Sequence, residues 1–182
     1  MEFKLVESNN ELEQILELQN DNHYENISPD LKKENGFVTV RHNFELLSLM
    51  NKKAKQIIAT KNGKVIGYAL VMLKEFRNLI PILIPMFDTF ENTLYKNSKL
   101  SNFNYYVMGQ VCISEKFRGK EVFKNLYLKH KEVYSSRFDL CLTEVSSSNP
   151  RSMRAHQKVG FKTISTFNDE TDQWNILSWD WK

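Results

Sequence analysis

The sequence predicts an α/β protein in which helices pack on one central mixed β-sheet. Three observations lead to this prediction. Runs rich in β-forming residues alternate with stretches whose apolar residues recur at helical spacing. The dipeptide Asn62-Gly63 separates two such runs and predicts a tight hairpin of type I′. Another apolar run ends at Ser114 and leads through a short basic turn into a helical pattern that reaches about Tyr134.

Size and composition indicate a single globular domain, residues 1–182. The 41% hydrophobic and 26% charged residues are ordinary for a soluble protein with a substantial core. The net charge of +3 is small and the basic residues are dispersed, which does not favour nucleic acid as a partner. No signal-peptide core is present, and the longest apolar stretch, 79–87, is too short to span a bilayer. We therefore expect a cytoplasmic protein without a membrane partner.

The two cysteines, Cys112 and Cys141, both lie in apolar strand-like runs. Their spacing from the histidines does not resemble a zinc site, so we expect no metal. Buried free thiols in a reducing compartment are the favoured state, and a disulfide between neighbouring strands is the less favoured alternative.

The first 73 residues predict a strand, three helices and a hairpin. The expected elements are a strand over 3–6, a helix capped by Asn9 or Asn10 that ends at 20–22, a short helix from Ser28 to near Gly36, a helix from Phe44 to about Ala54 capped by Asn43, and hairpin strands over 56–60 and 65–73.

The segment 74–104 has a less regular pattern. Pro81 and Pro85 exclude a regular helix or a central strand there. Phe87, Phe90 and Leu94 then recur at helical spacing, which predicts a loop and a short helix. The segment either covers the core or forms one wall of a substrate pocket, and the sequence leaves both alternatives open.

The last third predicts two further strand–helix pairs and a final hairpin. The expected elements are a strand over 107–114, a helix over 122–134, a strand over 139–145, a helix that Asn149 caps and Gly160 ends, and strands over 162–167 and 174–181. Alternation places Trp179 and Trp181 on the same face, which is typical of a core or an interface.

The basic turn of Arg118, Gly119 and Lys120 stands between a strand and a helix. The first turn of a helix presents free backbone N–H groups and the positive end of its dipole to anions. We therefore expect a phosphate-bearing cofactor at this turn. The alternative is an ordinary surface turn after a core strand.

Two blocks within 110–161 resemble the core of the GCN5-related N-acetyltransferase (GNAT) family. The family's first signature is Gln or Arg, two residues, Gly, one residue, and Gly or Ala, and it corresponds to 118–123. Its later signature runs from Asn149 through a helix to Gly160-Phe161. Glu121 and Phe123 replace the two small residues of the first signature. The resemblance implies a mostly antiparallel central sheet of about seven strands, splayed between the two strands that hold the CoA arm.

The resemblance further implies an enzyme that transfers acetyl from acetyl-CoA, its co-substrate, to a primary amine. Direct attack in a ternary complex is the expected route. The cofactor-binding positions that correspond to the family's motif are Val111, Cys112, Ile113, Arg118, Gly119, Lys120, Glu121, Val122, Phe123 and Asn149.

Two residues correspond to the family's catalytic positions. His156 stands where the family usually has a Tyr that protonates the departing thiolate, and a histidine with an ordinary pKa of about 6.5 is partly protonated near neutral pH. Glu144 matches the base of the ribosomal-protein N-terminal acetyltransferase subgroup, and Gln110 is expected to position a water. The structural alternatives are a packed helix histidine and a strand glutamate paired with a lysine.

Other functions stay open at this stage. Glu121 and Phe123 in the phosphate turn are compatible with a non-catalytic acyl-CoA-binding or regulatory module on the same fold. A basic protein that binds nucleic acid is a weaker alternative. The acceptor, a small-molecule or a peptide amine, is not identified by any motif, and the last hairpin is a candidate homodimer contact.

Overall fold

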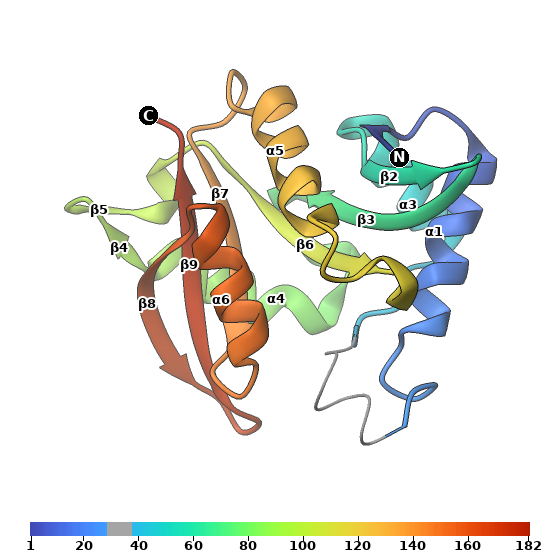
Figure 1. Ribbon diagram of the computed structural model, residues 1–182. Coiled ribbons are helices and arrows are strands. Elements are labelled where there is room, and N and C mark those ends of the chain that lie inside the picture. Colours follow the sequence, from blue (N-terminus) through green and yellow to red (C-terminus); the bar gives the residue numbers. More distant parts are fainter. Residues whose placement is uncertain (29–37) are drawn as a thin grey trace. The chain divides into compact units, whose positions relative to one another are not determined.

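Figure 1 shows the computed structural model, which describes residues 1–28 and 38–182. The short helix expected after Ser28 lies outside the described residues. The strand order in the main sheet is β1-β2-β3-β6-β7-β9-β8. The pairs β1–β2, β2–β3, β7–β9 and β8–β9 are antiparallel, whereas β6 and β7 are parallel. The predicted mixed, mostly antiparallel sheet is therefore confirmed.

The main sheet and its helices have the following bounds. The strands are β1 (Glu2–Leu5), β2 (Ile57–Lys61), β3 (Lys64–Met72), β6 (Tyr105–Ile113), β7 (Leu140–Ser146), β8 (Lys162–Asn168) and β9 (Gln173–Asp180). The α-helices are α1 (Asn9–Asp21), α3 (Phe44–Lys53), α4 (Ile84–Asn92), α5 (Val122–Tyr134) and α6 (Pro150–Val159).

The chain divides into two compact units. The first contains residues 1–71 and 109–130, and the second contains residues 72–108 and 131–182. Strand β6 and helix α5 each begin in one unit and end in the other. This division does not test whether the chain folds as a single domain, which stays a prediction.

In the first unit, α1 and α3 bury their apolar faces in a core shared with β2, β3 and β6. The hairpin between β2 and β3 has positive φ at Asn62 and Gly63, 51° and 74°, as a type I′ turn requires. The expected cap of α1 was wrong by one residue. Ser8 caps the helix, because its hydroxyl accepts from the Glu11 N–H at 3.3 Å while the Glu11 carboxylate accepts from the Ser8 N–H at 3.1 Å.

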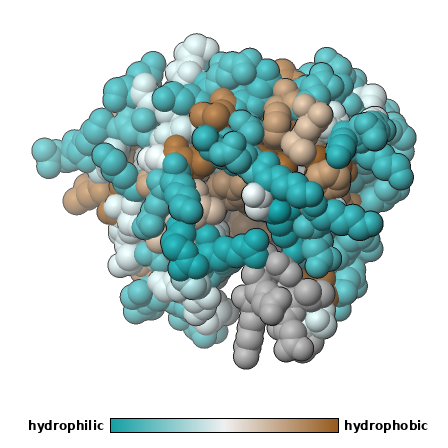
Figure 2. Space-filling view, in the orientation of Figure 1, coloured by the Kyte–Doolittle hydropathy of each residue, from teal (hydrophilic) through white to brown (hydrophobic). Residues whose placement is uncertain are grey.

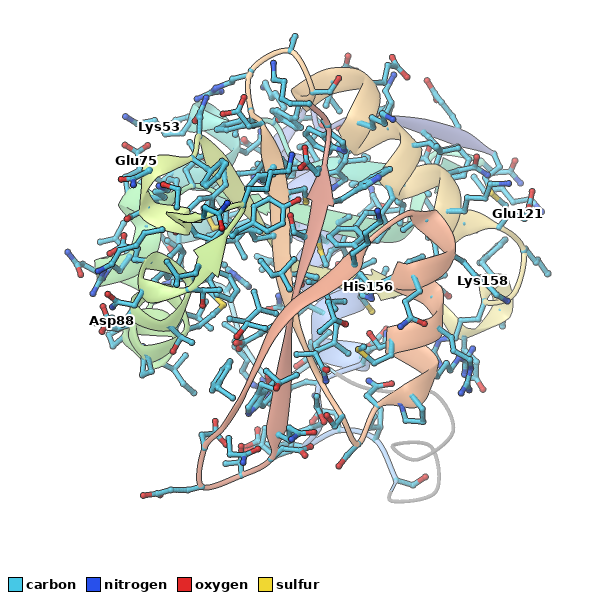
Figure 3. The ribbon with its side chains drawn as sticks, turned by 90° about the vertical axis from the view of Figure 1, so that its left-hand side faces the viewer. Lys53, Glu75, Asp88, Glu121, His156 and Lys158 are labelled. Carbon is cyan, nitrogen blue, oxygen red and sulfur yellow. The ribbon has the colours of Figure 1, made fainter. Side chains whose placement is uncertain are left out.

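In the second unit, α4 and α6 cover opposite faces of the strands β7, β9 and β8 (Figures 1 and 3). The face under α6 carries Trp179, whose ring lies 5.5 Å from Phe161, the residue just after the end of α6. Trp179 and Trp181 share this face, as predicted, with ring centroids 5.5 Å apart. Directly opposed residues of neighbouring strands share a face. Cys141 opposite Trp179 and Thr143 opposite Leu177 therefore face α6, and Glu144 opposite Ile176 faces the other side.

The segment 74–104 forms short helices and one small hairpin. Two 3₁₀ helices, η1 (Lys74–Leu79) and η2 (Pro81–Leu83), precede α4, and the hairpin β4–β5 (Leu94–Tyr95, Ser98–Lys99) and η3 (Leu100–Asn102) follow it. Phe87 and Phe90 are fully buried, as a cover over the core requires. Leu94 was wrongly expected on the helix: it lies in β4, and 68% of its surface is exposed.

The outer face seen in Figure 2 is mostly hydrophilic, and its hydrophobic residues form small separate groups. Within the described ranges, no helix has both the length and the apolar character needed to cross a membrane.

Gly160 ends α6 in the left-handed region, with φ of 115°. A Cβ at this position would lie 2.7 Å from the Trp179 indole nitrogen, whereas a Cβ at Gly63, which also has positive φ, would meet nothing within 4 Å. Gly160→Ala should therefore lower the free energy of unfolding by about 3 kcal/mol, because backbone strain and a steric clash add up. The control Gly63→Ala should lose only about 1–2 kcal/mol, from the backbone term alone. Urea unfolding measures both, and equal losses would contradict the clash.

Candidate functional site

The parallel pairing of β6 with β7 stops early. It joins Tyr105 with Leu140, Tyr106 with Cys141 and Val107 with Leu142, and it extends no further although β7 continues to Ser146. At the next step the Thr143 hydroxyl donates to the Met108 carbonyl oxygen at 3.2 Å. The ladder between these two strands thus ends at Val107 and Leu142, and the splay expected beyond it stays a prediction.

Glu144 is the first β7 residue after this bond, and its carboxyl group is unusual. It lies on the α4-facing side, and among the described residues its buried Oε2 atom has no hydrogen-bond partner. Burial raises the pKa of the Glu144 carboxyl to about 7, and the negative charge of Asp169 adds to this rise. Asp169 stays ionised because hydrogen bonds from Thr171 and from the Asp172 backbone lower its pKa to about 2. The carboxyl group of Glu144 can therefore exchange a proton near neutral pH.

The expectation of a partly protonated His156 is wrong. The side chain is only 2% exposed, and burial lowers its pKa to about 4. Nδ1 lies 2.8 Å from the Ser152 carbonyl oxygen, one helical turn earlier, and the ring packs edge-on against Phe161. In Figure 3, His156 lies on the strand side of α6, while Lys158 points outward. Its ring contact with Phe161 places His156 on the α6-facing side of the strands, opposite to Glu144.

Asn149 caps α6, as predicted. Its side-chain oxygen accepts from the Ser152 N–H at 3.0 Å, and Pro150 occupies the first helical turn. A direct contact between Asn149 and a cofactor stays a prediction.

The positions Val111, Cys112 and Ile113 lie at the end of β6 that belongs to the first unit. Cys112 is buried, and burial raises the pKa of its thiol to about 12, so its thiolate is unavailable as a nucleophile near neutral pH. The neighbouring Gln110 is held in a buried network. Its Oε1 accepts from the Tyr68 hydroxyl and from Gln19, each at 2.7 Å, and its Nε2 donates to the Val40 carbonyl oxygen at 2.9 Å. These bonds hold Gln110 in the packing of α1 against β6, and its expected contact with a water stays a prediction.

The turn that is expected to bind phosphate has two residues in the left-handed region. Gly119 and Glu121 have positive φ, 75° and 58°. The bond from the Asn125 N–H to the Glu121 carbonyl oxygen, 3.0 Å long, is the first of the helical type in α5. The amides of the first helical turn, 122–124, precede it and have no acceptor within the helix. These amides and the helix dipole fit a diphosphate, whichever side chains stand at these positions.

The charged side chains of the turn divide into two kinds. Arg118 links the turn to two neighbouring segments. Its Nε donates to the Ile113 carbonyl oxygen at 3.0 Å and its Nη2 to the Asn22 side-chain oxygen at 2.6 Å. The ammonium groups of Lys120 and Lys61 each lie 5.4 Å from the ring centre of Phe117. Neither lysine forms an ion pair within the described part of the chain, so both can meet an anion. Lys61 lies at the end of β2 and is not part of any motif.

The two residues that depart from the signature each contact a side chain of α5. The Glu121 side chain is 71% exposed and pairs with Lys124 at 3.4 Å, and in Figure 3 it projects from the outside of the turn. Phe123 stacks on Tyr127, with ring centres 4.7 Å apart, and Val122 is buried near Gly67. The turn thus has residues in the left-handed region although Glu121 and Phe123 replace the two small residues of the signature.

The structure brings the cofactor-binding candidates 111–113 and 118–123 together in the first unit, and it places Glu144, Asn149 and His156 in the second. Sequence reasoning missed Thr143 and Lys61, because a threonine in a strand and a lysine beside a hairpin turn carry no signal of their own. Asp169 was recognised only as part of a polar loop. No cluster of potential metal ligands occurs among the described residues.

At the level of sequence, the chain matches no family model and no curated protein. Its fold matches solved structures over nearly its whole length. A GNAT-family acetyltransferase from Streptococcus agalactiae 2603 is 16% identical, with 98% of this chain and 94% of that chain covered and a TM-score of 0.65. A ribosomal-protein-alanine N-acetyltransferase from Brucella melitensis is 13% identical, with 99% of each chain covered and a TM-score of 0.65.

An N-acetyltransferase from Staphylococcus aureus Mu50 gives the same result, at 15% identity, with 100% of this chain and 98% of that chain covered and a TM-score of 0.64. At sequence identities of 13% to 16%, the similarity to these structures concerns the fold alone. Together with the early end of the β6–β7 pairing and the left-handed phosphate turn, it shows that this chain has the GNAT fold.

Proposed function

We propose that this protein transfers the acetyl group of acetyl-CoA to a primary amine, with Glu144 as the general base. The observation that carries the proposal is the half-buried Glu144 side chain, whose buried Oε2 atom lacks a partner within the described structure and whose carboxyl pKa is about 7. A buried carboxyl oxygen without a partner costs folding free energy, and such costs concentrate at functional sites. On the fold of acetyltransferases, a base poised near neutral pH has a definite task.

That task is to remove a proton from the acceptor. An amine is mostly protonated at neutral pH and has no lone pair with which to attack. The Glu144 carboxylate takes one proton from the ammonium, and the freed nitrogen then forms a bond to the thioester carbonyl carbon. The carbon–sulfur bond breaks, the second nitrogen proton leaves, and the sulfur leaves as a thiolate that takes up one proton. The products are the acetamide, free CoA and one net proton.

The residues of the first unit fit the co-substrate. The amides of 122–124 and the α5 dipole suit its diphosphate, and the ammonium groups of Lys61 and Lys120 add positive charge near the turn. The backbone of 111–113 is proposed to hold the pantetheine arm. Cys112 has no covalent role, because its thiol stays protonated near neutral pH.

His156 is not the proton donor to the thiolate in this proposal. A group with a pKa of about 4 is neutral at pH 7, and its Nδ1 is hydrogen-bonded to the Ser152 carbonyl. Its role is to hold the end of α6 against Phe161. CoA thiolate is a moderately weak base, comparable to a free cysteine thiolate with a pKa of about 8.5, and can take its proton from water.

The test of the proposal has two arms. Calorimetry first measures binding of CoA and acetyl-CoA to the whole chain. A thiol-release assay then uses acetyl-CoA against alkyl amines, polyamines, lysine and peptides with free N-termini. Binding together with release on at least one amine supports the proposal. Binding without release on any amine supports the non-catalytic module instead, and absence of binding overturns both.

Replacing the base should separate chemistry from binding. Glu144→Gln keeps the shape of the side chain but cannot accept the proton, so turnover should fall about 10²–10⁴-fold. The dissociation constant of CoA should stay within about twofold of the wild-type value. In the wild type, kcat/KM should rise with pH through an apparent pKa near 7, the pH at which Glu144 ionises. A variant with wild-type turnover would contradict the assignment.

The same residue should leave a signature in stability without any substrate. The folded-state pKa of about 7 exceeds the unfolded value near 4.5, so the folded state binds more protons between these two pH values. The contribution of Glu144 to stability is therefore lost as pH rises from about 4.5 to 7, at up to about 1.4 kcal/mol per unit. In Glu144→Gln this part of the pH dependence should disappear. Urea unfolding at pH 5, 6 and 7.5 measures it, and parallel curves for the two proteins would contradict the raised pKa.

The phosphate turn allows backbone and charge to be tested separately. Glu121→Gly restores the residue type that tolerates φ of 58° and also removes a negative charge. It should stabilise the fold by about 1 kcal/mol and tighten CoA binding severalfold. Glu121→Gln removes only the charge, so it should tighten binding less and leave stability nearly unchanged. Chemical unfolding and calorimetry compare them, and equal stability of the two variants would contradict a strained Glu121.

A further inference from the structure

His42 stands at the margin of the first unit's core, in the irregular segment that leads into α3. Only 7% of its surface is exposed, whereas Arg41 and Asn43 on either side of it are exposed. Its Nδ1 lies 2.9 Å from the Gln19 side-chain nitrogen. Its Nε2 is buried and has no hydrogen-bond partner among the described residues. Such an atom costs stability unless a ligand or a water binds it.

The neighbouring amides determine which ring nitrogen carries the proton. The Gln19 Oε1 atom accepts from the His42 backbone N–H at 2.8 Å, so the other terminal atom of Gln19 is its NH₂ group. This group donates to the Gln110 Oε1 atom at 2.7 Å and to His42 Nδ1. Gln110 is oriented independently, because its Nε2 donates to the Val40 carbonyl oxygen at 2.9 Å. Nδ1 is therefore an acceptor, and in the neutral ring the proton is on Nε2.

Each of the other three histidines directs a ring nitrogen to a backbone carbonyl oxygen. These contacts are His23 Nε2 to Thr39 at 3.0 Å, His130 Nε2 to Ala69 at 3.3 Å, and His156 Nδ1 to Ser152 at 2.8 Å. All three residues are more deeply buried than His42. In this chain a buried histidine thus has a backbone partner, and the Nε2 atom of His42 departs from this pattern.

The donor on His42 is uncharged. A second proton, on Nδ1, would point at the NH₂ group of Gln19, and burial lowers the pKa of the His42 ring to about 4. The ring is therefore neutral near pH 7. A neutral, buried N–H group suits an uncharged oxygen, because it does not balance the charge of a carboxylate that has lost its hydration.

We propose that the Nε2–H group of His42 is a preset donor for an amide carbonyl oxygen of a ligand that the first unit binds. Gln19 and Gln110, which orient the ring, belong to the same unit as His42. Two kinds of ligand carry such an oxygen, a peptide and the pantetheine part of CoA. Binding of either does not require acetyl transfer.

The first test uses the whole chain with nitrogen-15-labelled histidine, and NMR follows the ring nitrogens at pH 7. Without ligand, His42 should carry its proton on Nε2, and His156 should carry it on Nδ1, the atom bonded to the Ser152 carbonyl. Glycyl-glycinamide and CoA are then added separately, with acetate as the charged comparison. The Nε2–H signal of His42 should move downfield and level off with at least one amide ligand, and that ligand identifies the source of the carbonyl. Acetate should leave the signal unchanged.

Two variants then separate the donor from the rest of the ring. His42→Asn keeps an oxygen near the Nδ1 position that can accept from Gln19, but it has no group at the Nε2 position. His42→Gln reaches the Nε2 position with its own NH₂ group. Calorimetry with the ligand that moves the signal should show about tenfold weaker binding in His42→Asn, the loss expected for one hydrogen bond. In His42→Gln the affinity should stay within about threefold of the wild-type value.

His130→Asn is the matched control, because His130 is buried and its Nε2 is bonded within the fold. It should lower the midpoint of urea unfolding and leave ligand affinity unchanged. If His42→Asn gives this same pattern, His42 has a packing role and the proposal fails. If His42→Asn does not fold, the titration of the wild type still decides.

The titration has three outcomes that overturn the proposal. A proton on His42 Nδ1 contradicts the orientation of the donor, and an Nε2 signal that neither amide ligand moves contradicts the site. An equal shift with acetate contradicts the preference for an uncharged oxygen. Absence of CoA binding would overturn the proposed acetyltransferase, while the peptide titration would still test His42.

Discussion

The main structural constraint is the end of the parallel ladder between β6 and β7, because both strands continue beyond it. Val107 with Leu142 is the last pair of β6 and β7, and β7 keeps its pairing with β9 as far as Ser146 opposite Trp174. Pairing thus continues on one side of β7 beyond the point where it ends on the other. Backbone groups left unpaired in this way are costly unless something else binds them. The bond from the Thr143 hydroxyl to the Met108 carbonyl oxygen lowers that cost directly after the last pair.

Glu144 lies two residues beyond the last pair, on β7. A residue beside a continuous ladder would lie in a uniformly packed layer, and an ionisable carboxyl there would have to be paired. Glu144 is half-buried and its buried Oε2 atom has no partner among the described residues, and burial raises the pKa of its carboxyl to about 7. Asp169, in the loop between β8 and β9, adds to this rise. The proton affinity of Glu144 therefore depends on strand geometry and on one loop charge, rather than on a neighbouring catalytic side chain.

Much of the fold could be predicted from the sequence, because local signals and the overall fold agree. Asn62-Gly63 fixed one hairpin, and Asn149 and Gly160 fixed both ends of α6. The errors lie where two residues offer the same local chemistry. Ser8 and Asn9 can both cap a helix, and only the reciprocal bonds with Glu11 decide between them. Leu94 continued a helical spacing that Thr93 ends, because nothing local distinguishes an exposed strand leucine from a buried helix one.

The site was less predictable, because a residue's role depends on surroundings that the sequence does not contain. His156 stands at a catalytic position of the family's motif, but burial against Phe161 makes its ring neutral. Glu121 replaces a glycine of the signature and still adopts the left-handed turn, with its charge directed outward. In one case the residue at the matching position has a lowered pKa, and in the other a residue that departs from the motif has a left-handed backbone. The phosphate motif therefore describes backbone conformation before it describes side chains, and a search by residue type alone undervalues this turn.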